Sequence, residues 1–427
     1  MFERPKSGER AVLVHLNLDP STGNELLREF KELAKAAGAE VLAIVTGNRR
    51  MPESHFFIGE GKAEEVRTKV LETHADLVLI NHQLSPSQER NLEKFLGCRV
   101  LDRTGLILDI FAQRARSFEG KLQVELAQHR HIATRLVRGW THLERQRGGS
   151  IGLRGPGETQ LELDRRLIGK RIQQLVKRLQ RVREQREQGR RTRLRHAVTT
   201  VSIVGYTNAG KSTLFNALTG AEMFAADQLF ATLDTTLRRL HLDEGRILVL
   251  ADTVGFIRQL PHDLVAAFRS TLQETEEAAL LLHVVDANDP QRDVYIETVN
   301  AVLAEIGAQS VPQLEVFNKI DLTGQLPAVE NGPDGKPRRV WVSAGSGAGL
   351  DLLRQAIAEC LRSETVQGWL KLAPAQSRAR AAFFGLGAVR EEKVEQDGSS
   401  LLQVELPRSE YQRLCRREGL NPSLLAL

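Results

Sequence analysis

The sequence predicts a multidomain α/β protein in four parts. Three observations lead to this fold class: strand and helix patterns alternate in two regions, apolar residues recur at a 4-3 spacing in a basic segment, and a glycine-rich loop follows a β-branched run. A chain of 427 residues has room for roughly two to four domains. We expect an N-terminal α/β domain over 1–112, an antiparallel helical coiled-coil arm over 113–196, a doubly wound sheet with a phosphate-binding loop (P-loop) over 197–364, and a small C-terminal α+β domain over 365–427.

The first 112 residues alternate between strand and helix patterns, which predicts a mostly parallel sheet. Gly59-Glu-Gly-Lys62 resembles a phosphate turn but lacks the full spacing, so a plain turn before a helix is the better interpretation. The expected strands are 11–18, 40–45, 55–58, 77–80 and 99–101, and the expected helices are 24–37, 62–73 and 86–96.

The next segment is strongly basic. Between Gln113 and His196 there are 22 Lys and Arg against 8 Asp and Glu, whereas the remainder holds 37 basic and 46 acidic residues. This excess of one sign favours a polyanionic partner, nucleic acid first; a solvated charged face is the alternative. The 4-3 spacing predicts two helices, the second over 160–194, that form an antiparallel coiled coil. The expected seam residues are Leu122, Leu126, His129, Ala133, Leu136, Trp140 and Leu143, then Leu161, Ile168, Ile172, Leu175, Leu179 and Val182.

A glycine-rich connection, 148–157, separates the two helices. It has five glycines, one arginine and no carboxylate, so it is too glycine-rich for a helix and longer than a simple turn requires. We expect a flexible tip that enters a cleft in a partner, with a disordered loop as the alternative. The candidate RNA contacts at this tip are Ile151, Leu153 and Arg154.

The stretch Gly205-Tyr-Thr-Asn-Ala-Gly-Lys-Ser212 fits the pattern Gly-x4-Gly-Lys-Ser/Thr between a predicted strand at 199–204 and a helix at 213–218. Glycines let the loop curl so that backbone N–H groups point at phosphates, and the helix N-terminus adds partial positive charge. We expect Lys211 to neutralise the β- and γ-phosphates and Ser212 to hold Mg²⁺.

Three further motifs each follow a predicted strand, in the order typical of a P-loop GTPase domain. Asp252-Thr-Val-Gly255 offers a carboxylate that binds Mg²⁺ through water and an N–H that senses the γ-phosphate. In Asn318-Lys-Ile-Asp321, the last carboxylate accepts two hydrogen bonds from guanine, which adenine cannot donate. Ser343-Ala344 closes over the base. A doubly wound sheet places all four loops at the carboxyl ends of its strands.

A switch loop is expected at Phe230-Ala-Thr-Leu-Asp234. Thr232 is our choice to complete the Mg²⁺ shell, with Thr235 and Thr236 as rivals. The candidate catalytic residues are Lys211, Thr232 and Gly255, and the candidate metal ligands are Ser212, Thr232 and Asp252. The candidate GTP-binding residues are Gly205, Tyr206, Thr207, Asn208, Ala209, Gly210, Lys211, Ser212, Phe230, Ala231, Thr232, Leu233, Asp234, Asp252, Thr253, Val254, Gly255, Asn318, Lys319, Ile320, Asp321, Ser343 and Ala344.

The remaining features are less specific. The C-terminal part predicts strands at 381–389 and 401–406 and a helix at 409–417. Cys98, Cys360 and Cys415 lie far apart without metal-ligand spacing, which favours reduced thiols in a cytoplasmic protein. The longest apolar run, 278–285, is too short to span a bilayer, and we expect no membrane partner.

Taken together, the motifs resemble the HflX family of ribosome-associated GTPases over essentially the whole chain. The specific run is Gly155-Pro-Gly-Glu-Thr-Gln-Leu-Glu-Leu-Asp-Arg-Arg166, followed by the P-loop, Phe230–Asp234, Asp252-Thr-Val-Gly-Phe256 and Asn318–Asp321. The resemblance implies GTP hydrolysis to GDP, binding to the large (50S) ribosomal subunit and its rRNA but not to DNA, and splitting of stalled or idle 70S ribosomes under stress such as heat shock. It also implies a monomer off the ribosome, cytoplasmic and partly ribosome-associated.

Two positions depart from the usual pattern. Phe256 stands where many GTPases carry the glutamine that orients water, which implies slow turnover assisted by K⁺, by the backbone or by the ribosome. Asn208 matches the P-loop asparagine that coordinates K⁺ in related GTPases, and Thr235 stands where the family usually has proline. Two alternative functions remain open: a nucleotide-gated rRNA-binding protein without splitting activity, and an RNA-modifying GTPase partner, for which the sequence shows no cofactor motif.

Overall fold

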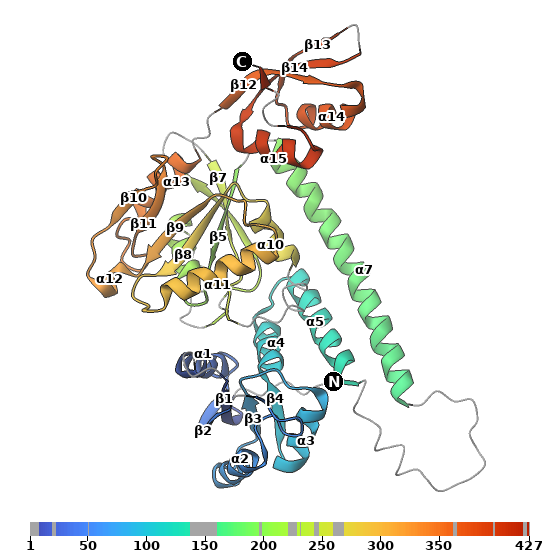
Figure 1. The fold of residues 1–427 in the computed structure, drawn as a ribbon, viewed down its shortest axis with the longest axis vertical. Coiled ribbons are helices and arrows are strands. Elements are labelled where there is room, and N and C mark those ends of the chain that lie inside the picture. Colours follow the sequence, from blue (N-terminus) through green and yellow to red (C-terminus); the bar gives the residue numbers. More distant parts are fainter. Residues whose placement is uncertain are drawn as a thin grey trace, which may run out of the picture. The chain divides into compact units, whose positions relative to one another are not determined.

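We analysed a computed structural model of the chain (Figure 1). It forms two compact units: the first contains 1–183, 224–234 and 254–271, and the second contains 184–223, 235–253 and 272–427. Two short segments that lie in sequence between strands of the second unit therefore belong to the first. The structure describes residues 8–18, 23–49, 51–136, 160–195, 199–220, 229–230, 232–242, 247–258, 269–361, 365–395, 398–421 and 425–426.

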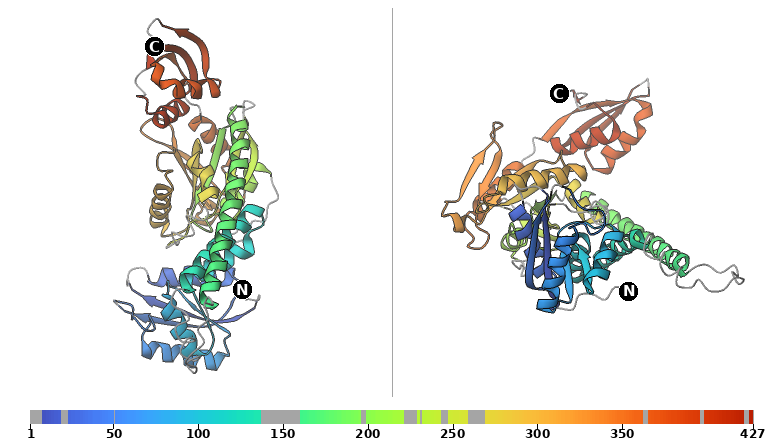
Figure 2. Two further views of the ribbon diagram at one scale, coloured as in Figure 1. Left: turned by 90° about the vertical axis from the view of Figure 1, so that its right-hand side faces the viewer. Right: turned by 60° about the horizontal axis from the view of Figure 1, so that its bottom comes forward.

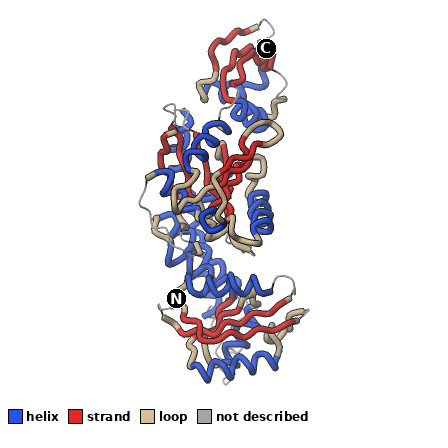
Figure 3. Tube along the Cα trace, turned by 90° about the vertical axis from the view of Figure 1, so that its left-hand side faces the viewer, coloured by secondary structure: helices blue, strands red, loops and turns tan. Residues whose placement is uncertain are grey.

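The first unit contains a four-stranded parallel sheet in the order β2-β1-β3-β4. The central strand β1 is buried along most of its length, as expected when helices cover both faces, and Figure 3 shows helices on both sides of this sheet. Helices α1 and α4 pack together on one face, and α2 packs with α3 on the other. The elements are β1 Arg10–Asn17, α1 Gly23–Ala36, β2 Glu40–Asn48, α2 Glu60–Thr73, β3 Leu77–Ile80, α3 Pro86–Leu96, β4 Arg99–Asp102 and α4 Arg103–Arg114.

Two long helices, α5 Phe118–Leu136 and α7 Gln160–Arg195, form the middle region. They lie side by side and run antiparallel (Figures 1 and 2). Arg171 of α7 forms an ion pair with Glu125 of α5. The antiparallel helix pair predicted from the 4-3 spacing is therefore present. Its buried contact consists of Leu122, Leu126, Leu175 and Leu179, with Ile172 at the edge; Trp140 and Leu143 lie outside the described residues.

The second unit is built on a seven-stranded sheet in the order β10-β11-β9-β8-β5-β7-β6. The five central strands are parallel, and β6 and β10 add antiparallel edges. The elements are β5 Thr199–Gly205, α8 Lys211–Thr219, β6 Thr236–His241, β7 Ile247–Asp252, α10 Arg269–Glu276, β8 Leu280–Asp286, α11 Arg292–Glu305, β9 Gln313–Asn318, α12 Ile320–Thr323, β10 Ala328–Asn331, β11 Pro337–Trp341 and α13 Leu350–Cys360.

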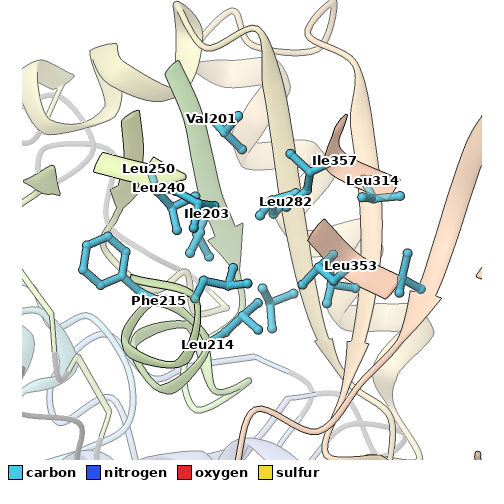
Figure 4. Close-up of a cluster of buried hydrophobic side chains, with 14 of the residues drawn as sticks. Val201, Ile203, Leu214, Phe215, Leu240, Leu250, Leu282, Leu314, Leu353 and Ile357 are labelled. Carbon is cyan, nitrogen blue, oxygen red and sulfur yellow. The ribbon is translucent and has the colours of Figure 1, made fainter. Parts of the chain in front are cut away.

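Residues of alternate parity along these strands point to opposite faces of the sheet. One face forms the main core with α8 and α13 (Figure 4), where Val201 and Leu282 meet Leu214 and Leu353. The other face is covered by α10 and α11: the Ser202 hydroxyl is 3.2 Å from that of Thr275, and Ile296 packs against a second cluster. A sheet covered on both faces leaves its strand ends and their loops for binding.

The C-terminal part is a four-stranded sheet, β13-β14-β12-β15, with antiparallel pairing. Helices α14 and α15 pack on it through a core that includes Phe383 and Leu402. The elements are β12 Thr365–Leu372, a 3₁₀ turn Pro374–Gln376, α14 Ser377–Gly385, β13 Val389–Val394, β14 Ser400–Pro407, α15 Arg408–Glu418 and β15 Leu425–Ala426.

Two predicted strands are wrong. The segment 381–389 is mostly α14, because its alanines favour helix and Ala379 and Phe383 bury one helical face at a spacing of four. The segment 55–58 is an irregular turn with one isolated bridge, and Phe57 has φ 66°. Three consecutive side chains, Phe56, Phe57 and Ile58, are buried there, which the alternation of a strand does not allow. Helix α4, Arg103–Arg114 with Asp102 as its N-cap, is not among the predicted helices.

Leu175→Ala should destabilise the helix pair by about 2–5 kcal/mol, because Leu175 is fully buried between α5 and α7 and its truncation leaves a cavity. Amide hydrogen exchange in both helices should speed up accordingly. The neighbouring Val176→Ala is the matched control, since Val176 is 43 % exposed and its loss should change stability by less than about 0.5 kcal/mol. Equal exchange in the two variants would contradict a buried seam.

Candidate functional site

The P-loop is shaped by two glycines whose neighbours leave no room for a side chain. Gly205 has φ 150°, and a Cβ there would lie 2.3 Å from the carbonyl oxygen of Val284. Gly210 has φ 90°, and its Cβ would lie 2.2 Å from Nδ2 of Asn318. Both contacts are far inside van der Waals distance, so both fixed positions of the Gly-x4-Gly pattern require glycine in this fold.

Lys211 is buried inside the loop, and its Nζ donates a 2.6 Å hydrogen bond to the carbonyl of Tyr206. Burial lowers the pKa of Lys211 to about 8, although the nearby Asp252 carboxylate raises it. The Thr207 hydroxyl is also buried and has no hydrogen-bond partner among the described residues. A buried ammonium and an unsatisfied hydroxyl beside the N-terminus of α8 suit a phosphate chain.

Ser212 and Asp252 lie together at the base of the loop: the Ser212 hydroxyl donates a 2.9 Å hydrogen bond to Oδ2 of Asp252. Asp252 is the last residue of β7 and is almost completely buried. A hydroxyl and a carboxylate are hard oxygen donors of the kind that Mg²⁺ prefers, so the two residues fit that ion. Next to them, Thr253 donates to the carbonyl of Ile203 at 2.6 Å, which fixes the start of the Asp252–Gly255 motif against β5.

Asn318 joins three of the predicted loops. Its Nδ2 donates to the carbonyl of Ala209 in the P-loop at 3.0 Å, and its Oδ1 accepts from the N–H of Ala344 at 2.9 Å. Asn318 is 2 % exposed, so water cannot replace these bonds. The structure thereby brings the P-loop, the Asn318–Asp321 motif and the Ser343-Ala344 loop together at one edge of the sheet. Sequence reasoning missed this bridging role, because the motif pattern indicates only base binding.

The rest of the base-side motif is arranged around Asn318. Lys319 has φ 67° and pairs with Asp286, at the end of β8, at 2.8 Å. Asp321 is exposed, in the short helix α12. Ser343 is fully buried, and its hydroxyl accepts from the N–H of Ser346 at 3.1 Å, which shapes the turn beneath Ala344. Asp286 belongs to none of the motifs, so its ion pair with Lys319 could not be predicted from the sequence.

We call 229–234, which contains the predicted switch loop Phe230–Asp234, and 254–258, which follows Thr253, the two switch segments; both belong to the first unit. Phe230, with φ 56°, packs edge-to-face on Phe111 of α4 with ring centroids 4.7 Å apart. Leu233, Val254 and Phe256 are buried, and Thr232 is half-buried. The Asp234 carboxylate accepts hydrogen bonds at the start of α5. Ala231 and the tip residues Ile151, Leu153 and Arg154 lie outside the described residues.

Within the described residues, no helix is both long and apolar enough to cross a membrane.

A seven-stranded sheet that carries a P-loop and an Asn-Lys-Ile-Asp loop at the same edge defines a P-loop GTPase. Three family models match the chain: "GTP-binding GTPase N-terminal" over 24–112, "GTP-binding GTPase Middle Region" over 114–193, and "50S ribosome-binding GTPase" over 200–319. The chain is 58 % identical over 419 residues to the GTPase HflX of Escherichia coli, a match that covers 98 % of each protein. The chain belongs to the HflX family.

A second HflX relative agrees with this assignment. The GTPase HflX of Caldanaerobacter subterraneus is 49 % identical over 365 residues, which cover 86 % of this chain and 83 % of the relative. Among solved structures, a GTP-binding protein from Sulfolobus solfataricus in complex with GDP is 25 % identical, with a TM-score of 0.44, over 82 % of this chain and 98 % of that one.

Asn318→Ala should weaken GDP binding at least about tenfold, because it leaves a buried carbonyl and a buried N–H without partners and releases the P-loop. Affinity for xanthosine diphosphate should fall by the same factor, since the loss concerns the loop and not the base. Isothermal titration with both nucleotides measures this. An unchanged GDP affinity would remove Asn318 from its bridging role.

Asp321→Asn is the matched change on the same motif and should shift preference from guanine to xanthine by about 100-fold. A carboxylate accepts from guanine N1 and N2, whereas the Asn amide also donates to the xanthine 2-oxygen. Asp321 is exposed, and the Asn318 hydrogen bonds to Ala209 and Ala344 do not involve it, so total affinity for the preferred base should be retained. A competition assay with unchanged selectivity would exclude Asp321 as the guanine reader.

Proposed function

We propose that this GTPase binds the large ribosomal subunit and splits stalled or idle 70S ribosomes under stress, in the cytoplasm, with GTP binding and hydrolysis controlling association and release. The observation that carries the proposal is the combination, in one chain, of a guanine-nucleotide site with a long cationic helix pair. The match to the family described as "50S ribosome-binding GTPase" supports the large subunit as the partner.

The cationic surface is on α7, which at 36 residues is about 54 Å long at 1.5 Å per residue. Exposed basic residues recur along this helix outside the buried seam of Leu175 and Leu179. Phosphate-rich RNA is the partner that such a surface fits, because each neutralised phosphate releases a counterion. Among the α7 residues whose side chains the structure describes, the exposed basic ones are Arg165, Arg166, Lys170, Lys177, Arg178 and Arg181.

Hydrolysis uses the residues collected around the P-loop. Lys211 stabilises charge on the β- and γ-phosphates, and the Gly255 N–H contacts the γ-phosphate. Ser212 and, through water, Asp252 would hold Mg²⁺, with Thr232 as the third protein group, and the ion would supply charge neutralisation for the leaving phosphate. Because Phe256 has no hydrogen-bonding group to orient water and its ring is buried, assistance would come from K⁺ at Asn208, from the backbone or from the ribosome.

A nucleotide-gated rRNA-binding protein without splitting activity is the second candidate, because the exposed cations of α7 support binding by themselves. The two functions differ in what they require of the tip, 148–157. Splitting requires a segment that enters the subunit and displaces its partner, whereas binding needs only the flanking cations.

Purified protein with GTP should convert 70S ribosomes to free subunits in sedimentation profiles. Replacing 148–157 by a short flexible linker should abolish this conversion and retain binding to isolated large subunits within about threefold, because the α7 cations remain. Lys211→Ala, which cannot bind the phosphates, is the control for nucleotide dependence. If the wild-type protein binds large subunits but leaves 70S profiles unchanged, the binding-only function is the correct one.

A further inference from the structure

The Asp234 carboxylate, at the end of the switch segment 229–234, is bound to the first turn of α5. Its Oδ2 accepts from the backbone N–H groups of Arg116 and Ser117, at 2.8 and 2.7 Å, and its Oδ1 accepts from the Ser117 hydroxyl at 2.6 Å. Ser117 is itself the N-cap of α5, since its hydroxyl accepts from the N–H of Gly120 at 2.8 Å. We call these three bonds to Asp234 the latch.

Gly120 shows that α5 is shaped to receive this carboxylate. Glycine in a helix costs stability relative to alanine, and this one lies in the first turn of a 19-residue helix. A Cβ at Gly120 would lie 2.0 Å from Oδ1 of Asp234. The missing side chain is therefore the space that the carboxylate occupies. The helix N-terminus adds the partial positive charge that favours an anion there.

Other contacts hold the two switch segments to the first unit. Phe230 has a positive φ that is unfavourable for a bulky residue, and it is maintained by packing on Phe111. In the second segment, Arg258 pairs with Glu25 of α1 at 3.0 Å. Arg103, at the start of α4, donates to the carbonyl of Arg258 at 3.0 Å.

We propose that Asp234 is a positioning residue that couples the nucleotide site to the arm. The bound nucleotide changes the strength of the three latch hydrogen bonds between Asp234 and the start of α5. The arm, through the same bonds, sets the position of the switch segment. The proposal rests on the function proposed above and identifies Asp234 as the residue through which the nucleotide site acts on the arm.

The covalent chain makes this coupling direct. Thr232, the candidate Mg²⁺ and γ-phosphate contact, is two residues from Asp234, a span of about 7 Å at most. On the other side, Thr236 is paired with Asp252 in the sheet. We therefore expect a movement of Thr232 on nucleotide exchange to be transmitted to Asp234, whose carboxylate accepts from three donors in this structure and would lose them if it were released.

The first measurement is amide hydrogen exchange of the peptide 114–121, which includes both latch N–H groups, with GDP and with a non-hydrolysable GTP analogue. In the wild-type protein the two nucleotides should give exchange rates that differ about fivefold or more. Gly120→Ala should give fast exchange with both nucleotides, since the new Cβ displaces the carboxylate although alanine favours the helix. Asp234→Asn should also speed up amide exchange of 114–121, because a neutral amide accepts hydrogen bonds more weakly than a carboxylate.

Gly169→Ala is the matched control, because Gly169 lies inside α7 and a Cβ added there would meet nothing within 4 Å among the described residues. It should leave the exchange of 114–121 and its nucleotide dependence unchanged. Gly120→Ala should also retain GDP affinity within about twofold, since Gly120 does not contact nucleotide. Exchange at 114–121 that is the same with both nucleotides, or unaffected by Gly120→Ala, would overturn the latch.

The second measurement is the GTP hydrolysis rate with and without large subunits. The ratio of the two rates should fall at least about fivefold toward one in Gly120→Ala and not in Gly169→Ala. If the rate ratio of the wild-type protein is already one, the proposed ribosome-linked function is contradicted. The hydrogen exchange of 114–121 still tests the latch in that case. If the wild-type ratio is high and Gly120→Ala leaves it unchanged, the coupling proposal fails and the proposed function stands.

Discussion

The two hydrogen bonds of the Asn318 side-chain amide are the interactions on which the nucleotide site depends. They join the P-loop to the loop that follows β11, and they are buried, so no solvent competes for them. The same amide fills the space beside Gly210, which explains in steric terms why that position must be glycine. Once Asn318 is in place, the P-loop backbone at Ala209 and the backbone at Ala344 have one relative position.

The parallel strands bring the P-loop, the Asn318–Asp321 loop and the Ser343-Ala344 loop to the same edge of the sheet. Each predicted motif follows one of the five parallel strands of the sheet, so the loops reach one edge of the sheet without long connections. One sheet face packs apolar side chains against α8 and α13, and the other is covered by α10 and α11, which leaves the strand ends and their loops for binding. Burial lowers the pKa of Lys211, and the negative charge of an incoming phosphate would raise that pKa again.

The division of the chain into two units has a functional consequence. Residues 224–234 and 254–271 lie within the sequence span that matches the GTPase family, 200–319, yet they pack with the first unit. The groups that hold them are side chains of α1 and α4 and the N-terminus of α5. Elements of the N-terminal and middle regions, whose sequences carry no catalytic motif, therefore hold the segments expected to respond to GTP.

The sequence by itself determined the elements and the chemistry that depend on local pattern. The periodicity of apolar residues predicted the helix pair, and short motifs predicted the P-loop and the Asn318–Asp321 loop. Such loops can be predicted because their residues are close together in the sequence. Local pattern failed at 381–389, where apolar residues suited either a strand or a helix, and at 55–58, where three adjacent buried side chains belong to neither.

Only the tertiary structure decided which distant residues meet. Asn318 binds a carbonyl 109 residues away, and Asp234 binds a hydroxyl 117 residues away. Such contacts leave no periodic trace in the sequence, because each needs a single polar side chain at a point set by the packing of whole elements. Gly120 is unusual in sequence, because a helix prefers alanine to glycine. Only the folded structure shows that the Asp234 carboxylate occupies the space of the missing side chain.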